Sequence, residues 1–152
     1  MLRRARSSPA QTFVLFPFAV LAADLAVRRR PRIRTAWIVV MAGGYFLYRS
    51  AGRYRAARAG GRGIASTPRV LVTGGPYAIT RNPMYLGHLV FLAGLIGATR
   101  SPLAVALFSR QLARFRSRVA QDEDRLEQLF GDEYRAYRAR VPRWPLLPDT
   151  RD

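Results

Sequence analysis

Polar residues that could do chemistry gather in two short stretches of the sequence. The first runs from Gly74 to His88, where a glycine–proline turn leads to the polar pair Arg81–Asn82 and then to Pro83, a residue that suits the first turn of a helix. Backbone N–H groups at a helix start can bind a carboxylate or a phosphate. The stretch is also compatible with a plain loop, an N-cap asparagine and an interfacial tyrosine.

The second stretch is acidic, with Asp122, Glu123 and Asp124 surrounded by arginine. Carboxylates there could hold a cationic amino group or a ribose hydroxyl, or they could form a solvated helix face. His88 is the single histidine and could act as a base or bind a ligand, although a lone histidine near a helix end also serves packing. The chain has no cysteine, which excludes disulfides and zinc–thiolate sites, and we predict no metal site.

Composition indicates that helices at a membrane position these residues. Of the 152 residues 49% are hydrophobic, yet the formal net charge is +17, and all 26 basic residues are arginine. Membrane proteins combine these properties because apolar spans and charged ends are segregated along the chain. The arginines gather at the ends of apolar runs, which suits an anionic lipid surface. No recognition motif for nucleic acid accompanies the charge, so the expected partner is the lipid bilayer and no nucleic acid is expected.

Four apolar runs predict one domain over residues 1–152, an all-α polytopic membrane bundle with amphipathic helices at its C-terminal end. The predicted spans are residues 11–27, 35–48, 84–98 and 102–118. Arginines interrupt the fourth run after Phe108, so it is either a span whose arginines snorkel or face a polar cavity, or a short re-entrant arm.

Polar segments separate and follow these runs. Residues 49–68 predict a loop with a helical start at 53–59, and the Gly-Gly-Pro of residues 74–76 predicts a turn. Gly131 predicts a helix stop, and Asp132 predicts the N-cap of the next helix.

Arginine counts predict the topology. With four spans, the N-terminus, the second loop and the C-terminal tail share one side, and that side carries most of the arginines, although the first loop holds five. The positive-inside rule therefore places both termini in the cytoplasm, and we expect the protein in the plasma (inner) membrane.

Together the two polar stretches carry a family resemblance. Residues 71–77 (Leu-Val-Thr-Gly-Gly-Pro-Tyr) and 80–87 (Thr-Arg-Asn-Pro-Met-Tyr-Leu-Gly) look like the Gly-Pro-Tyr … Arg-His/Asn-Pro-x-Tyr-x-Gly signature of isoprenylcysteine carboxyl methyltransferases and related membrane methyltransferases. The acidic pair Asp122–Glu123 and the later Phe-Gly-Asp-Glu-Tyr … Tyr … Val-Pro-Arg-Trp resemble the end of the same family. The likeness covers residues 71–144, about half of the chain.

The resemblance implies a methyltransferase that uses S-adenosyl-L-methionine and acts on a lipidic acceptor. It implies that residues 70–144 form the cofactor-binding part. The residues implied to line the cofactor pocket are Tyr77, Asn82, Pro83, Tyr85, Leu86 and Gly87 on one side, and Asp122, Glu123, Tyr134 and Tyr137 on the other. His88, directly after the first motif, is a further candidate for a hydrogen bond to the cofactor.

The reaction restricts the catalytic candidates. Methyl transfer from a sulfonium is an in-line displacement that needs mainly alignment and exclusion of water. A carboxylate acceptor is already ionised and needs a cation to orient it, for which Arg81 and Arg143 are candidates. An amine acceptor needs a base, for which Glu123 and His88 are candidates. We predict O-methylation of an isoprenoid-type carboxylate, with a phospholipid amine N-methyltransferase and a non-catalytic membrane scaffold or sensor as the alternatives.

Overall fold

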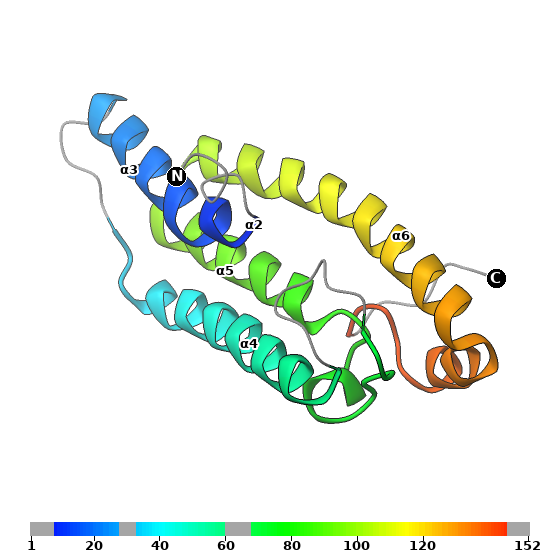
Figure 1. Cartoon of the computed structure of the whole chain (residues 1–152). Helices are drawn as coiled ribbons and strands as arrows, with labels where there is room; N and C mark the ends of the chain where they lie inside the picture. Colours follow the sequence, from blue (N-terminus) through cyan, green and yellow to red (C-terminus); the bar gives the residue numbers. More distant parts are fainter. Residues whose placement is uncertain (1–7, 28–32, 60–67, 146–152) are drawn as a thin grey trace. The chain divides into compact units, whose positions relative to one another are not determined.

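The computed structural model describes residues 8–27, 33–59 and 68–145, which are mostly helical and contain no strand (Figure 1). The predicted all-α fold is therefore confirmed. In chain order the elements are α2 (Ser8–Ala10), the π-helix η1 (Gln11–Leu15), α3 (Phe16–Val27), α4 (Ala36–Ala59), the 3-10 helix η2 (Gly75–Ala78), α5 (Pro83–Thr99) and α6 (Pro102–Arg140).

The predicted membrane spans fall on these helices. Residues 11–27 cover η1 and α3, and the other three spans lie almost wholly within α4, α5 and α6. Over the described ranges, none of the helices is both long enough and apolar enough to cross a membrane.

Helix α4 extends further than the sequence pattern predicted. Residues 49–68 were expected to be a loop with a helical start at 53–59. The loop at 49–52 is wrong because α4 continues without a break to Ala59, whereas the helix at 53–59 is confirmed. Arginine and alanine are good helix formers, so the change from apolar to charged residues ended the apolar run without ending the helix. The rest of that loop at 60–67, and the arginines at 3–6 and 28–32 that entered the predicted topology, lie outside the described residues.

Helix α6 also continues where its apolar run stops. It passes through the arginines that follow Phe108 and keeps helical geometry up to Gly131, whose φ of 49° and ψ of −119° form an elbow. The predicted helix stop at Gly131 is confirmed. The Gly-Gly-Pro turn is confirmed as well, because Gly75 has a φ of 59° at the start of η2.

The chain divides into two compact units. Unit 1 contains Met1–Phe46 and Gly87–Arg114, and unit 2 contains Leu47–Leu86 and Phe115–Asp152. The prediction of one domain over the whole chain stays a prediction.

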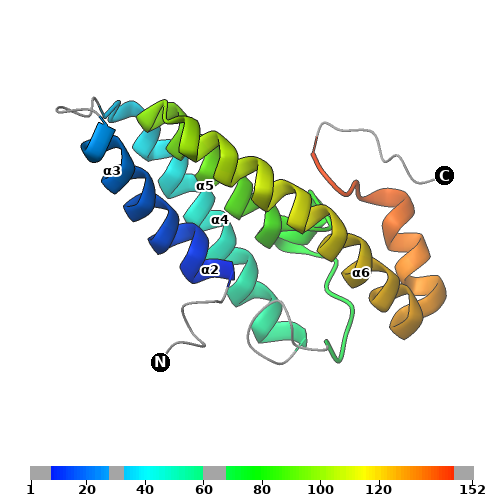
Figure 2. The ribbon, with the colours of Figure 1, turned by 90° about the horizontal axis from the view of Figure 1, so that it is seen from above.

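In unit 1, the segments from α3, α4, α5 and α6 lie side by side (Figures 1 and 2). Its core is apolar and joins Phe16 and Val20 of α3 to Leu92 and Leu95 of α5 and Ala104 of α6. A buried hydrogen bond of 2.9 Å from the Ser101 hydroxyl to the Asp24 carboxylate ties α3 to the start of α6. Hydrophobic burial and this polar contact together fix α3 in unit 1.

Unit 2 holds the first polar stretch against the end of α4. Ala51 of α4 packs against Tyr77 and Met84, with Tyr54 and Val72 beside them. A Cβ added to Gly75 would lie 2.5 Å from the ring of Tyr54, so the turn needs glycine both for its positive φ and for the close approach of that ring.

Replacing Gly75 by alanine should therefore destabilise the protein by about 1–2 kcal/mol for the positive φ alone, and the displaced Tyr54 ring adds to this loss. The matched control is Gly43→Ala, because Gly43 is helical and nothing lies within 4 Å of its added Cβ. Thermal unfolding of the detergent-purified variants measures both. Equal melting temperatures for the two variants would contradict this account of the turn.

Candidate functional site

A buried carboxylate on α6 is the centre of the polar contacts in unit 2. Glu123 is 4% exposed and accepts two hydrogen bonds from the Arg143 guanidinium, from Nε at 3.1 Å and from Nη2 at 2.6 Å. The side-chain amide of Asn82 donates a third at 3.1 Å, and Nη2 of Arg81 lies 3.8 Å from the same carboxylate. The parallel arginine–carboxylate pair is the strongest common hydrogen-bonded arrangement of charged side chains.

These contacts join three distant parts of the sequence. The Thr80 hydroxyl donates to the backbone oxygen of Arg143 at 2.7 Å, and the Arg81 amide donates to the backbone oxygen of Pro142 at 3.0 Å. The Glu123 clamp, defined as Glu123 with Arg81, Asn82 and Arg143, therefore holds the loop before α5 and the segment after α6 together. Pro83 can then start α5 at a fixed place, since its missing N–H costs nothing at a helix start.

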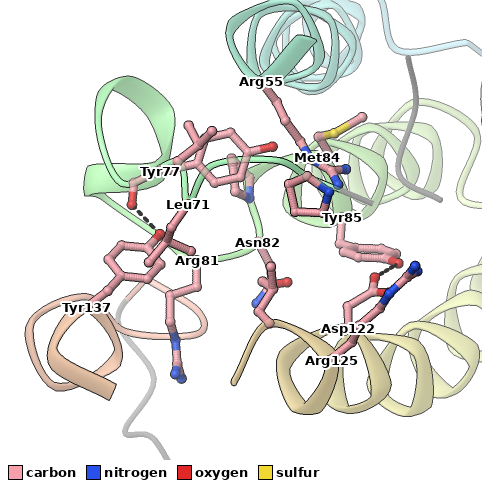
Figure 3. Close-up of a pocket in the computed structure, with 14 residues that line it drawn as sticks. Arg55, Leu71, Tyr77, Arg81, Asn82, Met84, Tyr85, Asp122, Arg125 and Tyr137 are labelled. Atoms are coloured by element: carbon pink, nitrogen blue, oxygen red, sulfur yellow. Dashed lines mark hydrogen bonds between the residues drawn. The ribbon is translucent and has the colours of Figure 1, made fainter. Parts of the chain in front are cut away.

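Beside the clamp, unit 2 contains a pocket that is open to solvent. The lining comes from the end of α4, the stretch up to the first turn of α5, and α6 (Figure 3). The lining residues are Arg55, Pro68, Leu71, Val72, Tyr77, Arg81, Asn82, Pro83, Met84, Tyr85, Asp122, Arg125, Leu126 and Tyr137.

Two tyrosine hydrogen bonds fix opposite sides of the pocket (Figure 3). The Tyr85 hydroxyl donates to the Asp122 carboxylate at 2.6 Å, and the Tyr85 ring meets the Phe115 ring edge to face. On the other side the Tyr137 hydroxyl donates to the backbone oxygen of Tyr77 at 2.7 Å. Burial raises the pKa of Tyr77 to about 12, with Arg55 opposing the rise, and burial also raises the pKa of Tyr137. Both tyrosines therefore remain neutral at physiological pH.

The charged residues of the pocket are mainly positive. The lining contains three guanidinium groups, those of Arg55, Arg81 and Arg125, and one carboxylate, that of Asp122. The pocket can thus receive an anionic group, while Asp122 supplies one place for a cation. The rest of the wall consists of the amide of Asn82 and of aromatic and aliphatic side chains.

The structure brings seven of the predicted site residues to this pocket: Tyr77, Arg81, Asn82, Pro83, Tyr85, Asp122 and Tyr137. Six predicted residues do not line it: Leu86, Gly87, His88, Glu123, Tyr134 and Arg143. Glu123 and Arg143 belong to the clamp and pair with each other outside the lining of the pocket. Tyr134 is fully buried and packs with Leu71 and Tyr137. His88 belongs to unit 1, where it is fully buried and stacks on Phe13 with 4.6 Å between ring centroids.

Sequence reasoning missed seven lining residues: Arg55, Pro68, Leu71, Val72, Met84, Arg125 and Leu126. Three of them, Leu71, Val72 and Met84, lie inside the first motif and could have been included. Arg125 and Leu126 follow Asp122 at three and four residues, a spacing that places them on one helix face. Arg55 carried no signal, because it lies outside both motifs, in the segment expected to be a loop with a helical start at 53–59.

The comparison with known proteins covers the first motif and the beginning of the second. The sequence profile of the phospholipid methyltransferase family matches residues 36–133, and the chain belongs to this family. The match covers α4, the pocket stretch, α5 and most of α6.

Individual relatives match a similar part of the chain. A protein-S-isoprenylcysteine O-methyltransferase from Schizosaccharomyces pombe is 38% identical over 81 residues, which is 52% of this chain and 34% of the relative. One from Arabidopsis thaliana is 37% identical over 73 residues, 47% of this chain and 37% of the relative. One from Mus musculus is 35% identical over 78 residues, 51% of this chain and 28% of the relative. The matched segment thus spans about a third of each relative, and the predicted resemblance to isoprenylcysteine methyltransferases is confirmed.

Removing the clamp carboxylate should destabilise unit 2. Glu123→Ala deprives Arg81 and Arg143 of a buried counter-charge, a change that typically costs about 3–5 kcal/mol. We expect the melting temperature to fall by about 10 °C. The control is Glu133→Ala, because Glu133 is an exposed acid of the helix after the elbow. If Glu123→Ala and Glu133→Ala unfold at the same temperature by circular dichroism, Glu123 does not hold this part of the structure together.

Proposed function

We propose that this protein is an integral membrane methyltransferase that uses S-adenosyl-L-methionine and methylates a lipidic carboxylate of isoprenoid type. The observation that carries the proposal is the pocket of unit 2, because both family motifs contribute to its wall. Family membership and relatives named as isoprenylcysteine O-methyltransferases support the same activity.

The pocket's chemistry fits the proposed cofactor. S-Adenosyl-L-methionine has an aromatic base, ribose hydroxyls, a carboxylate and two cationic centres, and when bound it supplies an electrophilic methyl group. The walls at Tyr77 and Tyr137 suit the base or the sulfonium, since aromatic faces attract cations. Asp122 is the one acid among the described lining residues and suits a cationic or hydroxyl group.

The surroundings favour a carboxylate acceptor over an amine. An amine would have to lose a proton, and the two bases considered for that step were Glu123 and His88. Glu123 is held by Arg143 and Asn82, and His88 is buried in unit 1 against Phe13. A carboxylate needs no base, so the lining residues have only to orient the acceptor and exclude water.

Exposed apolar side chains support membrane insertion. Of the large hydrophobic residues exposed in the described ranges, only Val70, Ile79 and Leu129 belong to unit 2. Those of unit 1 are Val14, Leu15, Phe18, Leu25, Val27, Ile33, Trp37, Ile38, Val39, Tyr45, Phe46 and Val105. So many exposed apolar side chains indicate an interaction surface. We propose that lipid acyl chains cover this surface, because the arginines at the ends of the apolar runs suit an anionic lipid surface.

Cofactor binding tests the activity. Isothermal titration of S-adenosyl-L-methionine into the detergent-purified protein should show micromolar binding, and Asp122→Asn should weaken it about 10- to 100-fold, the value of a charged hydrogen bond. Asp124→Asn is the matched control, because Asp124 is exposed and does not line the pocket. A well-folded wild type that binds no cofactor would leave the non-catalytic scaffold or sensor as the better proposal.

Membrane insertion has its own test. When membranes of expressing cells are washed with alkaline carbonate, which removes peripheral proteins, the protein should stay in the pellet because lipid covers the apolar surface of unit 1. Detergent should release it. Recovery of folded protein in the carbonate supernatant would argue against insertion without affecting the cofactor test.

A further inference from the structure

We propose that Arg55 and Arg125 form the subsite that receives the anionic group of the acceptor, so that these two residues determine the choice of a carboxylate over an amine. The inference rests on the proposed function and deepens it. It assigns the acceptor-orienting role, for which the sequence suggested Arg81 and Arg143, to two other cations.

The Glu123 clamp makes the earlier candidates poor choices for this role. Arg143 uses Nε and Nη2 on the carboxylate of Glu123 and does not line the pocket. The Arg81 side chain is 2% exposed and also faces Glu123. An acceptor that enters from outside needs a cation that it can reach, and a guanidinium group on a side chain that is 2% exposed offers little surface for such a contact.

Arg55 and Arg125 meet this requirement from two different helices. Arg55 projects from the end of α4 and is half-buried, whereas Arg125 projects from α6 and is exposed. Both line the part of the pocket that contains Tyr85 and Asp122 (Figure 3). Asp122 accepts the Tyr85 hydroxyl at 2.6 Å, so this part of the pocket has two guanidinium groups and one hydrogen-bonded carboxylate. Its charge favours an anion, and a guanidinium fork matches a carboxylate in shape.

Methyl transfer removes the negative charge of the acceptor, and this loss of charge changes how strongly Arg55 and Arg125 attract it. A carboxylate oxygen of the acceptor forms a bond to the methyl carbon as the bond from sulfur to that carbon breaks, and the electron pair stays on sulfur. The carboxylate becomes a neutral ester, the sulfonium becomes a neutral thioether, and no proton moves. Two arginines that attract the charged acceptor therefore lose their attraction for the product, which favours its release. Arg55 and Arg125 are also partly exposed, so they bind the unreacted acceptor only moderately. Very tight binding of the unreacted acceptor would slow the reaction.

The test compares two probes of nearly the same shape, one anionic and one neutral: acetylated S-farnesylcysteine with a free carboxylate, and the same compound as its carboxamide. Binding of each probe to detergent-purified protein is measured without methyl donor. Donor binding is measured by calorimetry, and the KM and kcat are measured for the acceptor. Arg55→Gln and Arg125→Gln should each weaken carboxylate binding and raise KM about tenfold, leave carboxamide and donor binding unchanged, and change kcat little. Arg55→Lys should recover part of the affinity, because it keeps the charge and loses the fork.

Arg53→Gln and Arg116→Gln are the matched controls. Each removes the same charge from the same helix at an exposed position that does not line the pocket, and both should behave as wild type. Equal loss for carboxylate and carboxamide would overturn the subsite, and so would unchanged carboxylate binding. A parallel loss of donor binding would overturn it too, by assigning the two arginines to the donor's carboxylate. Wild-type protein that binds no donor would instead count against the proposed function, while the probe comparison would still decide on the subsite.

Discussion

The organisation of unit 2 depends on burying the charge of Glu123. A carboxylate that leaves water loses several kcal/mol of hydration and is tolerated only when other groups replace that hydration. Here the replacements come from Arg81, Asn82 and Arg143, which lie 42, 41 and 20 residues away along the chain. The loop before α5 and the segment after α6 must therefore reach α6 together, and their backbone contacts follow from that meeting. The clamp fixes the geometry of the pocket, although only two of its members, Arg81 and Asn82, are part of the wall.

Helix geometry explains how adjacent acids take different roles. Asp122, Arg125 and Leu126 are spaced at three and four residues, share one face of α6 and line the pocket. Glu123 is rotated by about 100° from Asp122, as every next residue of an α-helix is, and so faces the segment after α6. One carboxylate is then available to a ligand while its neighbour supports the structure.

Local signals made part of this arrangement predictable. Pro83 at the first position of α5, the turn at Gly75 and the elbow at Gly131 follow from the conformational limits of proline and glycine, and the two motifs located most of the pocket. The end of α4 was misjudged because the pattern of apolar residues reports burial or lipid contact and does not report helix length. Periodicity also could not separate Glu123 from Asp122, because the partners that bury Glu123 come from distant parts of the chain. Arg55 was missed for the same reason, since its place in the pocket depends on tertiary packing.

The pocket is better suited to a reaction without proton transfer than to one that requires a base. Its tyrosines are neutral, with the pKa of Tyr77 raised to about 12, and Tyr85 and Tyr137 donate hydrogen bonds to Asp122 and to the backbone oxygen of Tyr77. The carboxylate that could have accepted a proton is occupied in the clamp, and Asp122 already accepts a hydroxyl. What the wall offers is positive charge, aromatic surface and fixed donors, which orient an anionic nucleophile without changing its protonation. Such a wall provides alignment and electrostatic guidance, which are the main requirements of methyl transfer to a carboxylate.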